Sequence, residues 1–172
     1  LPRLVEDTTA MIRHCQAEAR HCIWDLRTDS TAQEDLSASL QGWLRSRSAG
    51  ETVPVEFHAE GQVPDLGEGA PFQILRICQE AVNNALAHAG ATCITVALKS
   101  DENGLTLNIS DDGRGFDSRL IDSPKPGHFG LNSLNERARN IGAHLEIRSI
   151  LHQGTTVSLA LPAPNRMHES TR

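Results

Sequence analysis

The sequence predicts an α/β protein, a two-layer sandwich of helices on a mixed β-sheet, preceded by a helical segment. After residue 50 the chain shows strand and helix periodicity in the order strand, helix, strand, strand, loop, helix, strand, strand. Turn signals join two of the strand pairs directly, which indicates antiparallel neighbours and argues against a doubly wound parallel fold. Before residue 50, apolar residues recur at helical spacing, which predicts a separate helical part.

The composition limits the classes of partner. The chain has 172 residues and a net charge of −6, which argues against nucleic acid, because phosphate backbones are bound by clustered Lys and Arg. No apolar run is long enough to span a membrane, and no signal-peptide pattern is present. We therefore expect a cytoplasmic chain without membrane contact of its own, although a longer parent protein could be anchored in the cell membrane. The four cysteines form no C-x-x-C pair, which predicts reduced, packed thiols.

Residues 1–27 are predicted to form one long helix. Its apolar and small residues recur in steps of three and four: Leu4, Thr8, Met11, Cys15, Ala19, Cys22 and Leu26. At about 1.5 Å per residue this helix would be about 40 Å long, which favours one arm of a helical bundle over a surface helix. His14, Glu18 and His21 share one face, a pattern that could hold zinc but is more typical of solvated side chains.

A second helix is predicted from about residue 32 to residue 47, after a polar break at residues 28–31. Its apolar side is formed by Leu36, Leu40, Trp43 and Leu44. We place the boundary of the globular domain at residue 50. The predicted organisation is a bundle helix (1–28), a connecting helix (29–50), a globular domain (51–162) and a disordered tail (163–172).

The central helix of the domain is predicted over residues 71–90, with Pro71 in its first turn and Gly90 as its C-terminal cap. Its apolar face comprises Ile74, Cys78, Ala81, Val82, Ala85, Leu86 and Ala89. Glu80, Asn84 and His88 are four residues apart and form a polar stripe. On the helix alone, this stripe either faces solvent or lines a polar cleft in which Glu80 and Asn84 supply oxygens to a cation such as Mg²⁺.

The remaining elements follow from alternation and from turn residues. A strand over residues 53–59 precedes the central helix, and Pro54 indicates that it lies at a sheet edge. The elements after the helix are a strand (92–98), a hairpin turn (101–104), a strand (105–109), a mobile loop (118–129), a helix (131–141) and two strands (143–150 and 155–161).

Three glycine-containing motifs follow the polar stripe in the chain. Asp111-x-Gly113-x-Gly115 stands at the end of a strand, where glycines let the backbone approach a ligand closely. Gly127-His128-Phe129-Gly130-Leu131 opens a helix, and a helix N-terminus suits phosphate. Gly154-Thr155-Thr156 opens the last strand. Each motif alone is a weak signal of a ligand site, whereas their order after Glu80 and Asn84 is a specific one. The sequence contains no P-loop, Rossmann, G-x-S-x-G or H-E-x-x-H signature.

Together these residues resemble the ATP-binding module shared by histidine kinases, gyrase-type topoisomerases, Hsp90 chaperones and mismatch-repair ATPases, known as the Bergerat or GHKL fold. The resemblance covers about residues 72–162. QEAVNNALAHA resembles the N box, DDGRGFD the G1 box, GHFGLNSLNERA the G2 box, and GTTVSLALP the strand that follows. ARHCIWDLR, at residues 19–27, resembles the second dimerisation helix of nitrate-sensor-like (NarX/DesK-type) sensor kinases.

The resemblance implies a role for each matching residue. Asn84 would bind Mg²⁺, which bridges the ATP phosphates, and Glu80 would polarise the attacking group or orient a water on the metal. Asp111 would accept a hydrogen bond from the adenine 6-amino group, so that GTP is rejected. The other implied nucleotide-binding residues are His88 (ribose and phosphate side), Gly113 and Gly115 (chain passing over the base), Gly127, Gly130 and Leu131 (lid hinge and phosphate cradle), and Thr155 and Thr156 (phosphate side or adenine water network).

The sequence departs from the pattern of the sensor kinases in two places. A Lys or Arg often stands just before the position of His88, where this chain has Ala87; Arg114 or Lys125 could substitute. The phosphoacceptor His of these kinases is followed by an acidic residue, but His14 and His21 are each followed by a cysteine. The resemblance therefore implies that the acceptor helix lies upstream of residue 1.

The implied function is that of the catalytic region of a two-component sensor histidine kinase. Such a region transfers the ATP γ-phosphoryl group to a His of the upstream helix and then to an Asp of a response-regulator receiver domain, and the full-length protein is a homodimer. An ATP-gated interaction module without phosphotransfer is the alternative. A serine kinase acting on an anti-sigma antagonist is a third reading, but it gives no role to residues 1–27.

Overall fold

The computed structural model describes residues 35–117 and 129–163. The predicted bundle helix, its histidines and two of its cysteines lie outside these residues. Most of the predicted mobile loop, including Gly127, and residues 164–172 of the predicted tail also lie outside them.

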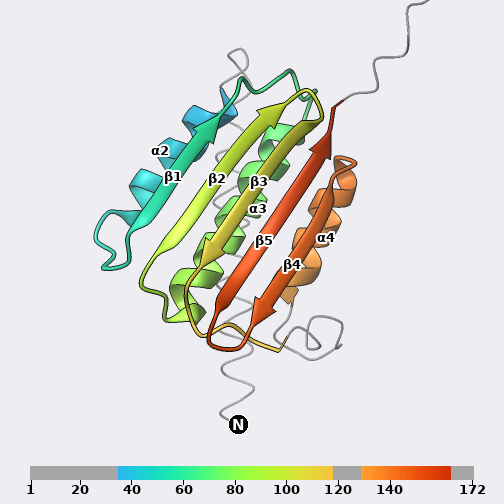
Figure 1. The fold of residues 1–172 in the computed structure, drawn as a ribbon. Helices are drawn as coiled ribbons and strands as arrows, with labels where there is room; N and C mark the ends of the chain where they lie inside the picture. The colour runs from blue at the N-terminus through green and yellow to red at the C-terminus, as the bar shows by residue number, and fades with distance from the viewer. Residues whose placement is uncertain (1–34, 118–128, 164–172) are drawn as a thin grey trace, which may run out of the picture.

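The described residues form a five-stranded mixed sheet with helices on one of its faces (Figure 1). The strands are β1 (Val55–Glu60), β2 (Ile94–Asp101), β3 (Gly104–Asp111), β4 (His144–Ile150) and β5 (Gly154–Pro162), in the spatial order β1-β2-β3-β5-β4. β1 runs parallel to β2, and the other neighbouring pairs are antiparallel. The helices are α2 (Leu36–Ser48), α3 (Ala70–Asn84) and α4 (Phe129–Asn140). The predicted two-layer α/β sandwich is confirmed.

Strand alternation builds the core between the sheet and the helices. In β2 and β3, Val96 pairs with Ile109 and Leu98 pairs with Leu107. Ile94 and Leu105 continue the same face at its two ends, and all six residues are buried. The intervening residues point to the opposite face, where several are small or polar. Because each fully buried aliphatic side chain contributes about 1.5–3 kcal/mol, this inner face supplies much of the driving force for folding.

The edge position predicted for the first strand is confirmed, and Pro54 shapes its start. β1 begins at Val55, two residues later than predicted, because proline has no N–H to give to a ladder. The Pro54 carbonyl instead accepts a hydrogen bond from the Ile94 N–H at 3.0 Å. β1 therefore joins the sheet through β2 alone and lies at its border.

The predicted hairpin between β2 and β3 is also confirmed. Asp101 pairs with Gly104, which leaves a two-residue turn, and the Asp101 carboxylate accepts the Asn103 N–H at 2.8 Å. Gly104 has φ +136°, and a Cβ there would lie 2.2 Å from the Leu161 carbonyl oxygen. Glycine is therefore required both by the turn and by the neighbouring strand.

α2 starts later than predicted and packs into the core of the sheet domain. Asp35 has a non-helical backbone (φ −51°, ψ 114°), and its carboxylate accepts the Ser37 N–H at 3.0 Å. It therefore caps the helix, which begins at Leu36 instead of residue 32. Leu36, Leu40 and Leu44 are buried in the same cluster as the sheet residues. The division of the chain at residue 50 stays a prediction, but α2 shares the core of the residues that follow it.

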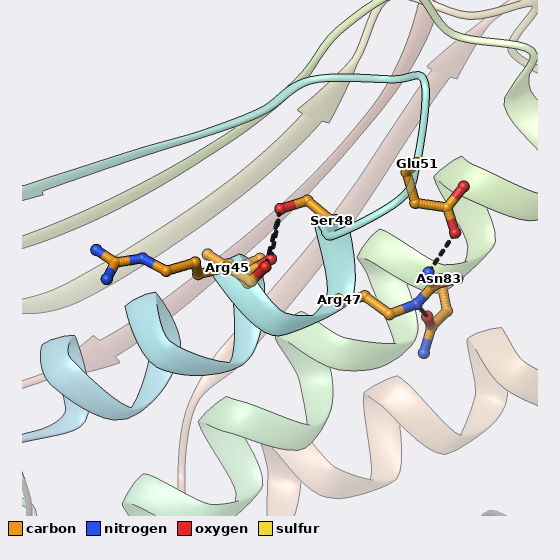
Figure 2. Close-up of polar contacts among 6 residues, drawn as sticks. Arg45, Arg47, Ser48, Glu51 and Asn83 are labelled. Atoms are coloured by element: carbon orange, nitrogen blue, oxygen red, sulfur yellow. Dashed lines mark hydrogen bonds and ion pairs between the residues drawn. The ribbon is translucent and has the colours of Figure 1, made fainter.

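A polar cluster joins the C-terminal end of α2 to α3 (Figure 2). The Arg47 guanidinium donates from Nε to Asn83 Oδ1 at 2.8 Å, and its Nη1 lies 2.5 Å from Glu51 Oε1. The Ser48 hydroxyl donates to the carbonyls of Leu44 and Arg45. The Arg45 side chain points away from α3 (Figure 2).

α3 buries the predicted apolar face, but its helical geometry changes at its C-terminal end. Gly69 caps its start with φ +82°, Pro71 lies in the first turn, and the predicted apolar face is buried except for Leu86, which is half-buried. The helix continues from Ala85 to Ala89 as a π-helix, η1, and Gly90 ends it in the left-handed region. π-helical turns are rare and are found frequently at functional sites.

Candidate functional site

Three polar residues stand in one row across the end of the sheet. Asp111 of β3 is the register partner of Thr155 of β5, and Thr155 is the partner of Ser149 of β4. Asp111 and Ser149 are buried, and their strand positions place them on the same face as the core residues Ile109 and Val157. The row therefore faces the helix layer, where α3 and η1 contact β3 and β5.

Asp111 combines burial with strong hydrogen bonding. Its residue is 9% exposed, and its Oδ1 accepts the Gly113 N–H at 2.9 Å. Burial raises the pKa of the Asp111 carboxyl above its ordinary value, although backbone hydrogen bonds from Gly113 and Thr155 act in the opposite direction. A buried carboxyl that keeps acceptor capacity suits a ligand N–H donor.

Asp112, the next residue, has a structural role. Its Oδ1 accepts the Thr92 N–H at 2.7 Å and the Cys93 N–H at 3.0 Å, and its Oδ2 accepts the Thr92 hydroxyl. The hydrogen bond from the Thr92 side chain and the two backbone bonds lower the pKa of the Asp112 carboxyl. The carboxylate thus holds the turn between η1 and β2.

Gly113 and Gly115 allow close packing of backbone against backbone. A Cβ on Gly113 would lie 2.5 Å from the Ala89 carbonyl oxygen, and one on Gly115 would lie 2.0 Å from the Ile150 carbonyl oxygen. Between them, the Arg114 N–H donates to the Ala89 carbonyl at 2.8 Å. The glycines bring the loop after β3 against η1 on one side and the β4–β5 turn on the other. Their predicted role beside a base stays a prediction.

On α3, Glu80 and Asn84 lie together as the spacing predicts. Asn84 Nδ2 donates to Glu80 Oε1 at 3.4 Å, and both residues are half-buried. Because a carboxylate only accepts, the amide nitrogen must face Glu80, which leaves Asn84 Oδ1 to accept or to bind a cation. Carboxylate and amide oxygens are the ligands that Mg²⁺ prefers, so the donor set fits a site completed by phosphate and water.

His88 lies beyond the α-helical part of the predicted stripe. It lies in η1, where the hydrogen bonds run from i to i+5, whereas Glu80 and Asn84 belong to α3. His88 is exposed. Its predicted place on the ribose and phosphate side of a nucleotide stays a prediction.

The two predicted threonines lie on opposite faces of the sheet. Thr155 is beside Asp111 on the inner face, but Thr156 pairs with Ser110 on the outer face, and its hydroxyl donates to Ser110 Oγ at 3.4 Å. Thr156 therefore does not share the inner face with Asp111, because consecutive strand residues point in opposite directions, and its role at a nucleotide stays a prediction.

Gly130 and Leu131 lie in the first turn of α4, which begins at Phe129. The prediction that this motif opens a helix is confirmed for these residues, two positions earlier than expected. α4 ends near Gly142, which has φ +69°, as predicted.

Residues 69–165 match the family of histidine kinase-, DNA gyrase B- and HSP90-like ATPases, which is more than half of the chain. The chain belongs to this family. The match begins at the cap of α3 and includes the Asp111 row, Glu80 and Asn84. The predicted GHKL ATP-binding fold is thereby confirmed.

The chain is similar to curated proteins that are named as sensor kinases. It is 28% identical to the histidine-protein kinase/phosphatase DegS of Brevibacillus brevis, over 92% of this chain and 40% of DegS. It is 29% identical to the sensor histidine kinase LiaS of Bacillus subtilis, over 99% of this chain and 45% of LiaS. It is 30% identical to the sensor protein VraS of Staphylococcus epidermidis, over 88% of this chain and 42% of VraS. The chain thus spans less than half the length of these relatives.

Solved histidine kinase structures share the fold. The ATP-binding domain of PrrB from Mycobacterium tuberculosis aligns with a TM-score of 0.62 at 20% identity, over 77% of this chain and 96% of PrrB. The histidine kinase domain of a blue-light activated kinase from Erythrobacter litoralis aligns with a TM-score of 0.60 at 22% identity, over 80% of this chain and 67% of that one.

Two residues near this ATPase site were not singled out from the sequence. The first is Asp112, which stands next to Asp111 and carries the η1–β2 turn. The second is Ser149, which takes an inward position in β4 after Leu145 and Ile147. A polar residue at an inward position of an alternating strand is the signal that could have identified Ser149.

The described residues contain neither a membrane-spanning helix nor a cluster of metal-binding side chains. None of the helices in residues 35–117 and 129–163 is long and apolar enough to cross a membrane. The same residues contain no cluster of three or more His, Cys, Asp or Glu side chains placed to hold a metal ion.

Proposed function

We propose that this chain is the ATP-binding catalytic region of a two-component sensor histidine kinase. In this proposal, the γ-phosphoryl group of ATP passes to a His on an upstream helix and then to an Asp of a response-regulator receiver domain. The full-length protein acts as a homodimer. The family membership and the names of the sensor-kinase relatives support this assignment.

The observation that carries the proposal is the buried Asp111 carboxyl in a match to an ATPase family. Asp111 accepts a hydrogen bond from the adenine 6-amino group. Guanine has an oxygen at the same position, so two acceptors would face each other and GTP would bind more weakly.

The phosphate side of the proposed site is assigned to α3 and α4. Asn84 Oδ1 is the proposed Mg²⁺ ligand, and the bound cation supplies charge neutralisation for the phosphates. Glu80 orients Asn84 through their hydrogen bond and polarises the attacking imidazole. The other proposed nucleotide-binding residues are His88, Gly113, Gly115, Gly127, Gly130, Leu131 and Thr155.

A titration of the chain with ATP in the presence of Mg²⁺, followed by calorimetry, tests the nucleotide site. We expect saturable ATP binding and at least about tenfold weaker binding of GTP, because one buried hydrogen bond is replaced by a repulsive contact. Equal affinity for the two nucleotides would refute the role of Asp111.

Phosphotransfer is tested separately from binding. The chain is incubated with γ-labelled ATP and an isolated acceptor-helix domain, and label on the acceptor His is measured. Transfer above that of the acceptor domain alone supports a kinase. Tight ATP binding without transfer would instead favour an ATP-gated interaction module.

A further inference from the structure

Ser149 is a buried hydroxyl that joins three segments of the chain beside Asp111. The residue is 7% exposed. Its Oγ accepts the Phe116 N–H at 2.8 Å, donates to the Gly154 carbonyl at 3.2 Å, and lies 3.0 Å from Thr155 Oγ1. The hydroxyl therefore connects the loop after β3, the strand β4 and the start of β5.

The three contacts of Ser149 can be made together in only one way. A serine hydroxyl has one hydrogen, and the Gly154 carbonyl can only accept, so that hydrogen is used at Gly154. The Phe116 N–H donates into one lone pair of Ser149 Oγ. The contact with Thr155 must then use the Thr155 hydroxyl hydrogen, with Ser149 as the acceptor.

This arrangement leaves Thr155 Oγ1 with lone pairs and without a free hydrogen. Thr155 is the register partner of Asp111 on the same face of the sheet, and its backbone also hydrogen-bonds the Asp111 carboxyl. Two acceptors, one carboxylate and one hydroxyl oxygen, thus stand side by side. A group with two N–H donors matches such a pair, whereas a carbonyl oxygen does not.

We propose that Ser149 is a positioning residue that holds the Thr155 hydroxyl as an acceptor and thereby makes the site prefer a 6-amino purine over a 6-oxo purine. The inference rests on the proposed ATP site and adds a determinant of base selectivity that does not touch the base. Without Ser149, the Thr155 hydroxyl is free to rotate and to donate to a 6-oxo group.

The test compares ATP with inosine triphosphate, which has an oxygen in place of the amino group. Dissociation constants of both nucleotides are measured by calorimetry for the wild-type chain and for Ser149→Ala. We expect the ratio of the dissociation constant of inosine triphosphate to that of ATP to fall about tenfold in the variant. This is the change in affinity expected when one hydrogen bond is redirected. A general loss of protein stability would weaken the binding of both nucleotides equally and would leave this ratio unchanged.

Three further variants complete the design. Ser149→Thr keeps the hydroxyl and should keep the ratio. Ser149→Cys preserves the shape but forms only weak hydrogen bonds, so it should lower the ratio even where Ser149→Ala fails to fold. Ser110→Ala is the matched control, because it removes the hydroxyl that accepts from Thr156 on the outer face, and it should leave the ratio unchanged.

The outcomes separate this inference from the proposed function. A wild-type chain that binds no ATP overturns both. Binding of ATP by the wild-type chain with an unchanged ratio in Ser149→Ala and Ser149→Cys overturns the positioning role alone. A fall of the same size in Ser110→Ala also overturns it, because the effect would then not depend on the inner-face row.

Discussion

At the scale of single residues, Asp111 and Asp112 show how position on a strand end decides the chemistry of a carboxyl. Asp111 points into the core side, where burial raises its pKa, and Asp112 points outward and accepts the Thr92 hydroxyl and N–H, which lower its pKa. Burial also raises the pKa of the Cys78 thiol to about 12, so it remains protonated and unreactive, as its apolar helix face predicts.

Asp111→Asn should weaken ATP binding by at least about tenfold. It should also be more stable than the wild type, by a margin that grows as the pH rises. The folded-state pKa of Asp111 lies above its unfolded value. Such a carboxyl does not destabilise the fold at low pH, where it is protonated in both states. It lowers the free energy of unfolding as the pH rises through the two pKa values. The stability gained by the variant over the wild type should therefore be larger at about pH 8 than at about pH 4, as measured by urea unfolding.

Asp112→Asn is the matched control for this prediction, because the pKa of Asp112 is shifted in the opposite direction. Its contribution to stability is present above the unfolded pKa and is lost as the pH falls through the folded pKa. The variant should therefore lose stability relative to the wild type as the pH rises. Slopes of the same sign in the two variants would contradict these assignments.

At the scale of elements, the end of α3 is held from both sides. The Arg47 guanidinium of α2 donates to Asn83, which is next to Asn84 (Figure 2). The Arg114 N–H of the loop after β3 donates to the Ala89 carbonyl of η1. One contact lies just before, and the other just after, the point where α-helical geometry changes to π-helical geometry. Glu80 and Asn84 belong to the α-helical part, and His88 to the π-helical part.

Arg47→Ala should lower the free energy of unfolding by about 0.5–1 kcal/mol, since the lost contacts are partly exposed. Chemical denaturation measures the change. Arg45→Ala is the control, because this arginine lies on the same helix and points away from α3 (Figure 2). An equal effect of the two substitutions would show that the Asn83 contact adds nothing to stability.

At the scale of the whole molecule, one core extends from α2 to β5. The buried leucines of α2 belong to the same cluster as the central strands, so the sheet domain and this helix are expected to unfold together. In residues 35–117 and 129–163, the helices cover one face of the sheet (Figure 1). The row of Asp111, Thr155 and Ser149 lies at one end of β3, β5 and β4, on the face that these helices cover.

Leu40→Ala tests the shared core. The side chain is fully buried, so the substitution should cost about 2–5 kcal/mol and lower the melting temperature of the whole sheet domain. Gln41→Ala, at the exposed neighbouring position, should change stability by less than about 0.5 kcal/mol. A sheet signal that melts unchanged in Leu40→Ala would show that α2 is a separate unit.

The sequence by itself determined the order and polarity of the elements, because these depend on local periodicity, caps and turn residues. The edge strand after Pro54, the hairpin at Gly104, the pairing of Glu80 with Asn84 and the exposed or buried faces of the central helix all follow from neighbours in the chain. The same alternation places Thr155 and Thr156 on opposite faces of the sheet.

Only the tertiary structure decided which distant residues share the site. Ser149, Thr155 and Asp111 become neighbours through strand register, which is set by pairing across three strands. The π-helical turn forms where the loop after β3 docks on Ala89, and α2 joins the core because its leucines find the sheet layer. Such contacts depend on the free energy of burying surfaces far apart in the chain, which no local pattern records.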